Sequence, residues 1–168
     1  MKRQLDGNTL GIEGVNAMEI NTFRDNELLS GISILAVLRH TSNMEISKCM
    51  LIEPLLSYSK VLRLLKRSNS SVKSIEDLII KESIVFSNFN ARYQEKAFLS
   101  INSMLLFEKL GLLEISNSGV KFCGDRFNFS DQTLGEKAKS RIAASQKLAE
   151  ILTKGEASDF YLSLRIEI

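Results

Sequence analysis

The stretch 97–122 constrains the fold of this chain more than any other part of the sequence. An apolar helical pattern covers Ala97–Leu110 and stops at Gly111, a residue type that commonly ends helices. Alternating apolar residues then continue on both sides of the turn at 117–119, which is typical of a two-stranded hairpin. A helix, a glycine stop and a short hairpin together make a winged-helix-like unit. We therefore predict a winged-helix-like β-hairpin inside a helical domain.

Apolar residues recur at helical spacing in most of the remaining sequence. We expect a polar loop at 41–45 and a short terminal strand at 160–168. Pro54 is expected to begin a helix, because proline fits the first turn but not a helix interior. The predicted fold class is mainly α: a compact helical domain with the hairpin, a C-terminal helix and the terminal strand. Further helices are expected over residues 20–38, 46–53, 54–66, 74–82 and 134–152.

One glycine interrupts the apolar face of the first expected helix. Gly31 stands among Leu28, Ile32 and Leu35, and a glycine inside a helix costs about 1 kcal/mol relative to alanine. Because a close helix–helix contact is the usual reason to keep such a residue, we expect a second helix to pack against Gly31.

Length and composition indicate one folded unit. The chain has 168 residues, of which 44% are apolar and 25% charged, as in ordinary globular domains. We predict a single domain over residues 19–168, preceded by an arm at 1–18 that is flexible or becomes ordered on a partner. A net charge of +2 does not favour a dedicated polyanion-binding protein.

The sequence contains no recognisable catalytic set, cofactor motif or membrane segment. The start lacks a signal-peptide core and no apolar run is long enough to cross a bilayer, so we expect a cytoplasmic protein. Cys49 and Cys123 fit two buried free thiols, or else a disulfide or metal pair; a lone histidine argues against zinc. That histidine, His40, ends an apolar helix, where it would interact with the helix dipole. We expect no enzyme, no cofactor and no metal.

Basic residues are concentrated along one predicted helix. Their spacing of three or four places them on one face, where they could contact phosphates or form an ordinary solvated surface. The last helix has a second basic set, which we expect to face outward: Lys137, Lys139, Arg141 and Lys147. The candidate nucleic-acid or partner contacts are Lys60, Arg63, Lys66, Arg67 and, beyond the next loop, Lys73.

The order of elements resembles a known family. The similarity rests on Ile20–Phe23 before the first helix, on Phe98–Asn102 continuing through Leu110–Leu113, and on Ala138–Leu152 closed by Phe160–Leu164. Over residues 19–168 the chain resembles the small middle component of bacterial three-component ABC-ATPase conflict systems, a group that includes Lamassu-type phage defence.

The resemblance implies a non-catalytic accessory subunit. It implies a hetero-oligomer with an SMC-like ABC ATPase and an effector, often a nuclease, in which the subunit helps to hold the complex inactive until foreign DNA is sensed. Contact with DNA would be made through the complex, and no membrane is involved. The alternative is a free-standing winged-helix DNA-binding regulator, although the helix before Gly111 is not basic. The candidate docking residues are Leu28, Ile32, Leu35, Phe160, Leu162, Leu164 and Ile166.

Overall fold

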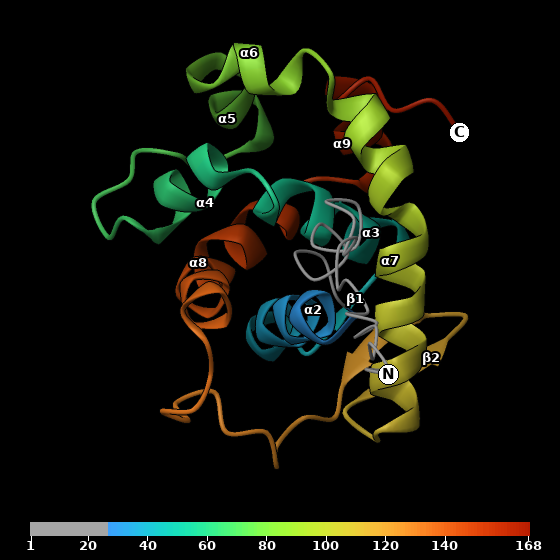
Figure 1. Ribbon diagram of the computed structural model, residues 1–168. Coiled ribbons are helices and arrows are strands. Elements are labelled where there is room, and N and C mark those ends of the chain that lie inside the picture. The colour runs from blue at the N-terminus through green and yellow to red at the C-terminus, as the bar shows by residue number, and fades with distance from the viewer. Residues whose placement is uncertain (1–26) are drawn as a thin grey trace, which may run out of the picture.

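The computed structural model describes residues 27–168, and there the chain is mainly α-helical with a small antiparallel sheet (Figure 1). The predicted arm at 1–18 and the first residues of the family resemblance lie outside the described residues. In chain order the elements are α2 (Glu27–Thr41), β1 (Asn43–Met44), α3 (Ile46–Leu56), α4 (Ser59–Lys66), α5 (Ile75–Lys81), α6 (Ser83–Phe86), α7 (Phe89–Lys109), β2 (Leu113–Ser116), β3 (Gly119–Phe122), α8 (Glu136–Leu152) and α9 (Ala157–Ser163).

The hairpin predicted from the sequence is confirmed, and a third strand joins it. Strands β2 and β3 pair antiparallel, and β1 adds to the far side of β3 in the order β1-β3-β2. Strand β1 lies in the stretch predicted to be a polar loop. A strand of two residues is too short to show the alternation of apolar and polar residues by which a strand is predicted. The sheet is thus built from one strand that follows α2 and from the hairpin that follows α7.

Gly111 ends α7 in the way the sequence predicts. It takes a φ of 70°, a left-handed conformation that glycine adopts without strain. Its N–H donates to the carbonyl of Glu108 at 2.8 Å, and the N–H of Leu112 donates to the carbonyl of Phe107 at 2.9 Å. This pair of bonds is the Schellman motif. The motif turns the chain directly into β2 and so sets the position of the hairpin beside α7.

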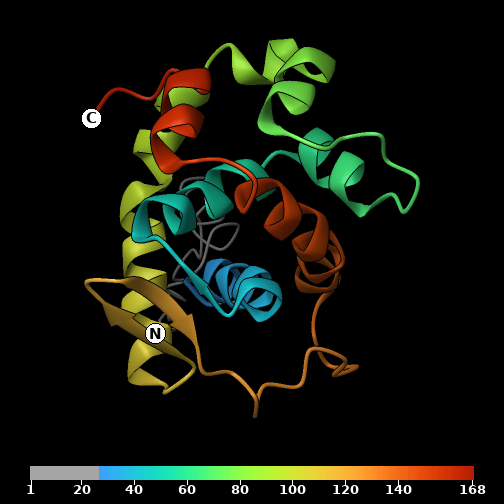
Figure 2. The same cartoon turned by 180° about the vertical axis from the view of Figure 1, so that it is seen from behind.

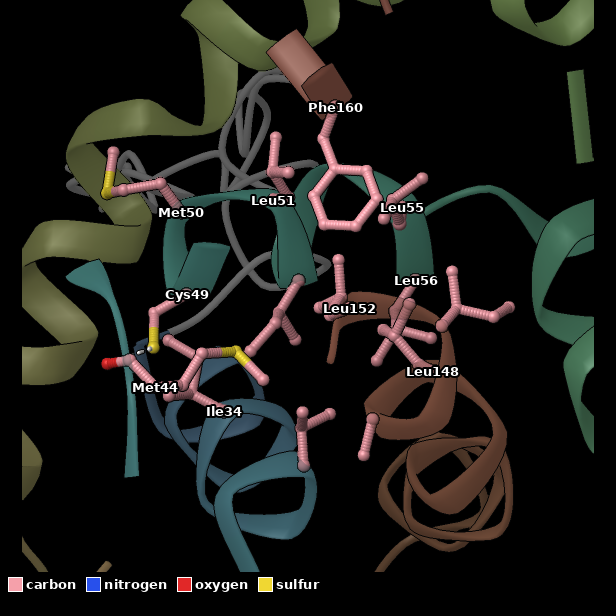
Figure 3. Close-up of a cluster of buried hydrophobic side chains, with 14 of the residues drawn as sticks. Ile34, Met44, Cys49, Met50, Leu51, Leu55, Leu56, Leu148, Leu152 and Phe160 are labelled. Atoms are coloured by element: carbon pink, nitrogen blue, oxygen red, sulfur yellow. Dashed lines mark hydrogen bonds between the residues drawn. The ribbon is translucent and has the colours of Figure 1, made fainter. Parts of the chain in front are cut away.

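The hydrophobic core surrounds α2. Between Ser30 and Leu38 this helix is buried on almost all sides, as expected for a helix that is apolar all round. Leu51 of α3 and Leu148 and Leu152 of α8 share the core with Ile34 of α2, and α7 closes another side (Figures 2 and 3). The sheet, α3 and α8 thus share one core with α2.

The close contact predicted at Gly31 is with α7. A β-carbon added at Gly31 would lie 2.0 Å from Cε2 of the Phe107 ring, far inside van der Waals contact. Phe107 is itself buried. The glycine therefore allows the aromatic ring to pack directly on the backbone of α2.

The prediction for Pro54 is wrong. Pro54 does not begin a helix but lies in the last turn of α3, and the break comes at Ser57 and Tyr58. Proline has no N–H, so the carbonyl of Met50, four residues earlier, loses its helical hydrogen bond. The hydroxyl of Ser57 donates to the carbonyl of Pro54, one of the last carbonyls of α3, at 2.9 Å.

The terminal strand predicted at 160–168 is also wrong. The segment forms α9, whose Phe160 is buried, and the following Leu164 is buried as well. Their spacing of four residues puts both on one helix face. Tyr161 links α9 to two other helices: its hydroxyl lies 2.9 Å from that of Tyr93 and donates to the carbonyl of Ser47 at 2.9 Å. Burial among these groups raises the pKa of Tyr161.

Candidate partner-binding surfaces

The predicted docking residues do not form one surface. Leu35, Phe160 and Leu164 are core residues and cannot meet a partner, so these three predictions are wrong. Ile32 and Ile166 are half-buried. Leu28 and Leu162 are exposed, but they lie on different helices, α2 and α9. Helical spacing identified the apolar residues correctly but did not show which of them the rest of the fold covers.

Three strongly exposed apolar side chains lie on the neighbouring helices α5, α6 and α9. Ile80, Ile84 and Leu162 are 77%, 83% and 77% exposed. These three residues define what we call the α5–α9 surface, at one end of the molecule (Figure 1). The hydroxyl of Ser163 donates to the carboxylate of Glu76 at 3.3 Å, which joins α9 to α5.

A groove of about 250 Å³ runs between the helices of the α5–α9 surface. Its floor is apolar and its rim carries hydroxyls and one arginine, a composition suited to an apolar side chain of a partner. The lining residues are Ile79, Ser83, Phe86, Ser87, Ser163, Leu164 and Arg165.

Helix α7 exposes a second apolar stripe. Phe98, Ile101 and Leu105 define this stripe and are 78%, 41% and 46% exposed. The spacing of these residues predicts α7 from the sequence and suggests that they face the core. The buried face of the helix instead carries Tyr93 and Met104. That buried face also carries Lys96, Ser100 and Ser103, so apolar periodicity alone could not identify it as the face that packs inward.

The basic residues predicted on α4 are all exposed. Lys66 reaches across to α8, where its amine donates to the hydroxyl of Ser140 at 2.9 Å, and Lys60 lies 3.9 Å from Glu82. Within the described residues Arg63 and Arg67 make no ion pair, which leaves both guanidinium groups available to a ligand. Lys73 is exposed beyond the loop, and its N–H donates to Asp77 at 2.8 Å.

The packing of α4 on α8 brings the two predicted basic sets together. A groove of about 580 Å³ lies between these helices. Lys137 lines it one turn before Ser140, the residue that Lys66 contacts. The other lining residues are Leu56, Ser57, Ser59, Leu62, Glu136 and Arg141.

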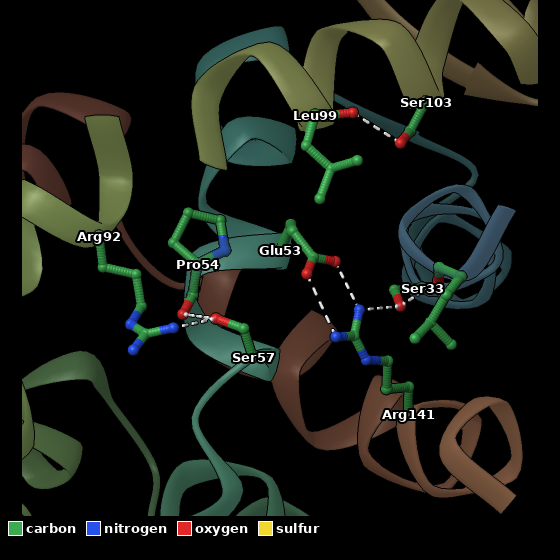
Figure 4. A network of polar contacts seen from close by, with 9 residues as sticks. Ser33, Glu53, Pro54, Ser57, Arg92, Leu99, Ser103 and Arg141 are labelled. Atoms are coloured by element: carbon green, nitrogen blue, oxygen red, sulfur yellow. Dashed lines mark hydrogen bonds and ion pairs between the residues drawn. The ribbon is translucent and has the colours of Figure 1, made fainter. Parts of the chain in front are cut away.

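Arg141 does not face outward, which corrects the prediction for α8. It is 6% exposed and forms a bidentate ion pair with Glu53, which is fully buried, at 2.5 and 3.2 Å (Figure 4). The same guanidinium donates to the hydroxyl of Ser33 at 3.1 Å, and that hydroxyl donates to the carbonyl of Leu29. The ion pair therefore ties α8, α3 and α2 together inside the core. No local pattern in the sequence indicates it.

The thiols and acids of the described residues form neither a disulfide nor a metal-binding cluster. Both cysteines are free; Cys49 is buried, and burial raises its pKa to about 12, so its thiol stays protonated. Between residues 27 and 168 no three His, Cys, Asp or Glu side chains are placed to hold a metal ion. In the same range no helix is both long and apolar enough to cross a membrane.

His40 lies in the last turn of α2, as predicted, and its Nε2 is 3.2 Å from the hydroxyl of Ser145. Burial, and then the charge of Arg39, lower its pKa below the ordinary 6.5, while Glu150 opposes the shift. The folded state therefore binds this proton less readily than the unfolded state.

We expect His40 to make the protein less stable as the pH is lowered. Its contribution is complete above pH 6.5, the unfolded value, and is lost as the pH falls toward the lower folded pKa. Thermal unfolding of wild type and of His40→Gln at pH 7 and at more acidic pH measures this. The acid-induced drop in Tm should be smaller in the variant; an equal drop in both proteins would rule out His40 as its source.

Comparisons of the whole chain with protein-family models, with curated proteins and with solved structures each found no match.

Proposed function

We propose that this protein is a non-catalytic accessory subunit of an SMC-like ATPase complex in antiphage or anti-plasmid defence. It would bind the ATPase and a separate effector, a nuclease by the family resemblance, and help to hold the assembly inactive until foreign DNA is sensed. The observation that carries the proposal is the α5–α9 surface. Its three large apolar side chains are exposed on the helices that border an apolar groove, and exposed side chains of this kind are costly to leave in water and typical of a protein-binding site.

The described fold also supports a protein partner over direct reading of DNA bases. In a DNA-reading winged helix, the helix before the hairpin presents polar and basic residues to the major groove. Here that helix is α7, and its outward face carries Phe98, Ile101 and Leu105. Apolar side chains of this size do not hydrogen-bond to base edges, so the free-standing regulator is the weaker alternative.

Substitutions on the α5–α9 surface should release the ATPase. The tagged protein is co-expressed with the products of its neighbouring genes, and the ATPase retained on the tag is measured. Ile80→Ser, Ile84→Ser and Leu162→Ser together should reduce retention at least tenfold, because each removes an apolar contact of about 1–2 kcal/mol. Ile168→Ser is the control: Ile168 is fully exposed, but it is not one of the three residues of this surface.

If the triple variant retains as much ATPase as the wild type does, the α5–α9 surface is not the ATPase-binding site. Failure of the wild type to retain any ATPase would contradict the proposed function itself. Thermal unfolding of each variant distinguishes lost binding from lost folding, and exposed positions of this kind should change Tm little.

The basic residues of α4 give a separate test of DNA contact. Arg63→Glu with Arg67→Glu should weaken binding of the complex to duplex DNA by about tenfold or more at low salt, because two phosphate contacts are replaced by repulsion. The log–log salt slope should become shallower by about 2. ATPase retention should not change. Loss of the ATPase with DNA binding intact would instead place Arg63 and Arg67 in the protein interface.

A further inference from the structure

The exposed stripe of α7 has the spacing of a coiled-coil seam. Phe98, Ile101 and Leu105 are separated by three and then four residues, so they occupy consecutive core positions of a heptad. Figures 1 and 2 show α7 along one flank of the molecule, with α2 and α3 on its inner side. The stripe faces away from the core and can receive a second helix along its length.

We propose that the second helix is α7 of another copy of this chain, antiparallel to the first about a two-fold axis. In that register Ile101 of each copy packs against Leu105 of the other, which forms a central layer of four aliphatic side chains. The same surface is used on both copies, as a two-fold contact requires.

The charged residues beside the stripe favour an antiparallel α7 of a second copy as the helix that binds there. Glu95, Asn102 and Lys109 follow one another at intervals of seven residues, and so they flank the seam on the same side. All three are exposed, and Glu95 remains 64% exposed although its carboxylate lies 3.0 Å from Lys96. Antiparallel pairing places Glu95 of each copy beside Lys109 of the other, and Asn102 beside its own counterpart. Parallel pairing would set Glu95 against Glu95 and Lys109 against Lys109.

The size of the stripe sets the strength of the association. Three apolar side chains cover much less than the roughly 800 Å² per partner of a standard interface. The dimer should therefore be weak, with a Kd on the order of tens to hundreds of micromolar. At low concentration the chain is a monomer, and an assembly that holds two copies close together would bring the α7 helices into contact. This inference does not depend on the proposed function.

Sedimentation of the full chain across that concentration range tests the dimer. The wild type should shift from monomer to dimer, and Phe98→Ser with Leu105→Ser should stay monomeric. Ile84→Ser with Leu162→Ser is the matched control, because those side chains are comparably exposed but lie on the α5–α9 surface. Glu95→Lys and Lys109→Glu should each weaken association several-fold, and the two together should restore it. A chain that stays monomeric throughout would contradict the proposal, as would a dimer that survives the Phe98 and Leu105 changes.

Disulfide trapping tests the register. In a Cys123→Ser background, Asn102→Cys should form a covalent dimer under mild oxidation, since the two positions face each other across the axis. Ser118→Cys, exposed at the tip of the hairpin, should do so far more slowly. Equal rates for the two cysteines would exclude this register. Loss of the ATPase from the Phe98→Ser Leu105→Ser variant, with a monomeric wild type, would assign the stripe to the ATPase and overturn the self-association.

Discussion

Replacing Arg141 with methionine should lower the free energy of unfolding by about 3–5 kcal/mol. The change leaves the carboxylate of Glu53, which is fully buried, without the guanidinium that holds both of its oxygens. A buried charge without a counter-charge is among the most destabilising defects in a core. Chemical denaturation of wild type and variant at neutral pH gives the difference directly.

Two further variants show whether the loss comes from the stranded charge. Glu53→Leu combined with Arg141→Met should recover most of the lost stability, because a buried ion pair can often be exchanged for apolar side chains of similar volume. Lys139→Met, on the same helix, removes the exposed pair with Glu136 and should cost less than about 1 kcal/mol. An Arg141→Met protein as stable as Lys139→Met would mean that Glu53 is not confined in the core.

Replacing Gly31 with alanine should also destabilise the protein, although alanine favours helices by about 1 kcal/mol. The added methyl group would lie 2.0 Å from the Phe107 ring, which is buried and cannot turn away freely. Either the ring or the spacing between α2 and α7 must shift. Overpacking of this kind costs about 1–3 kcal/mol, and so the net change should be a loss. Chemical denaturation of the alanine variant measures it.

The companion change is Phe107→Leu. In the Gly31→Ala background a smaller side chain at 107 removes the overlap, so the double variant should be more stable than the sum of the two single changes predicts. Gly135→Ala is the matched glycine control, since nothing lies within 4 Å of an added β-carbon there. Strict additivity of Gly31→Ala and Phe107→Leu would show that the helices adjust without strain.

Features set by local chemistry could be predicted from the sequence. The glycine stop at Gly111 and the hairpin after it depend on a few adjacent residues. The same is true of the helix cap at Ser74, whose hydroxyl accepts the N–H of Asp77 at 3.2 Å. The close helix contact at Gly31 is also predictable, because a glycine destabilises a helix interior and is usually kept there only where another element packs closely against it.

Features set by tertiary packing could not be predicted. Arg141 looks like a surface residue because arginine is rarely buried, and only the fold brings Glu53 to it. Phe98 is exposed although its spacing suits a core position, because the fold buries the face of α7 that carries Lys96, Ser100 and Ser103. The α5–α9 surface likewise depends on α9, a segment whose apolar residues fit a strand as well as a short helix.

Native mass spectrometry tests most directly whether this chain is a subunit of an ATPase assembly. The tagged wild-type protein is co-expressed with its neighbouring genes and purified under mild conditions. We expect a species whose mass includes the SMC-like ATPase together with this chain, and which dissociates into both on collisional activation. Recovery of the chain alone or with copies of itself, while the ATPase is expressed in the same cells, would contradict it.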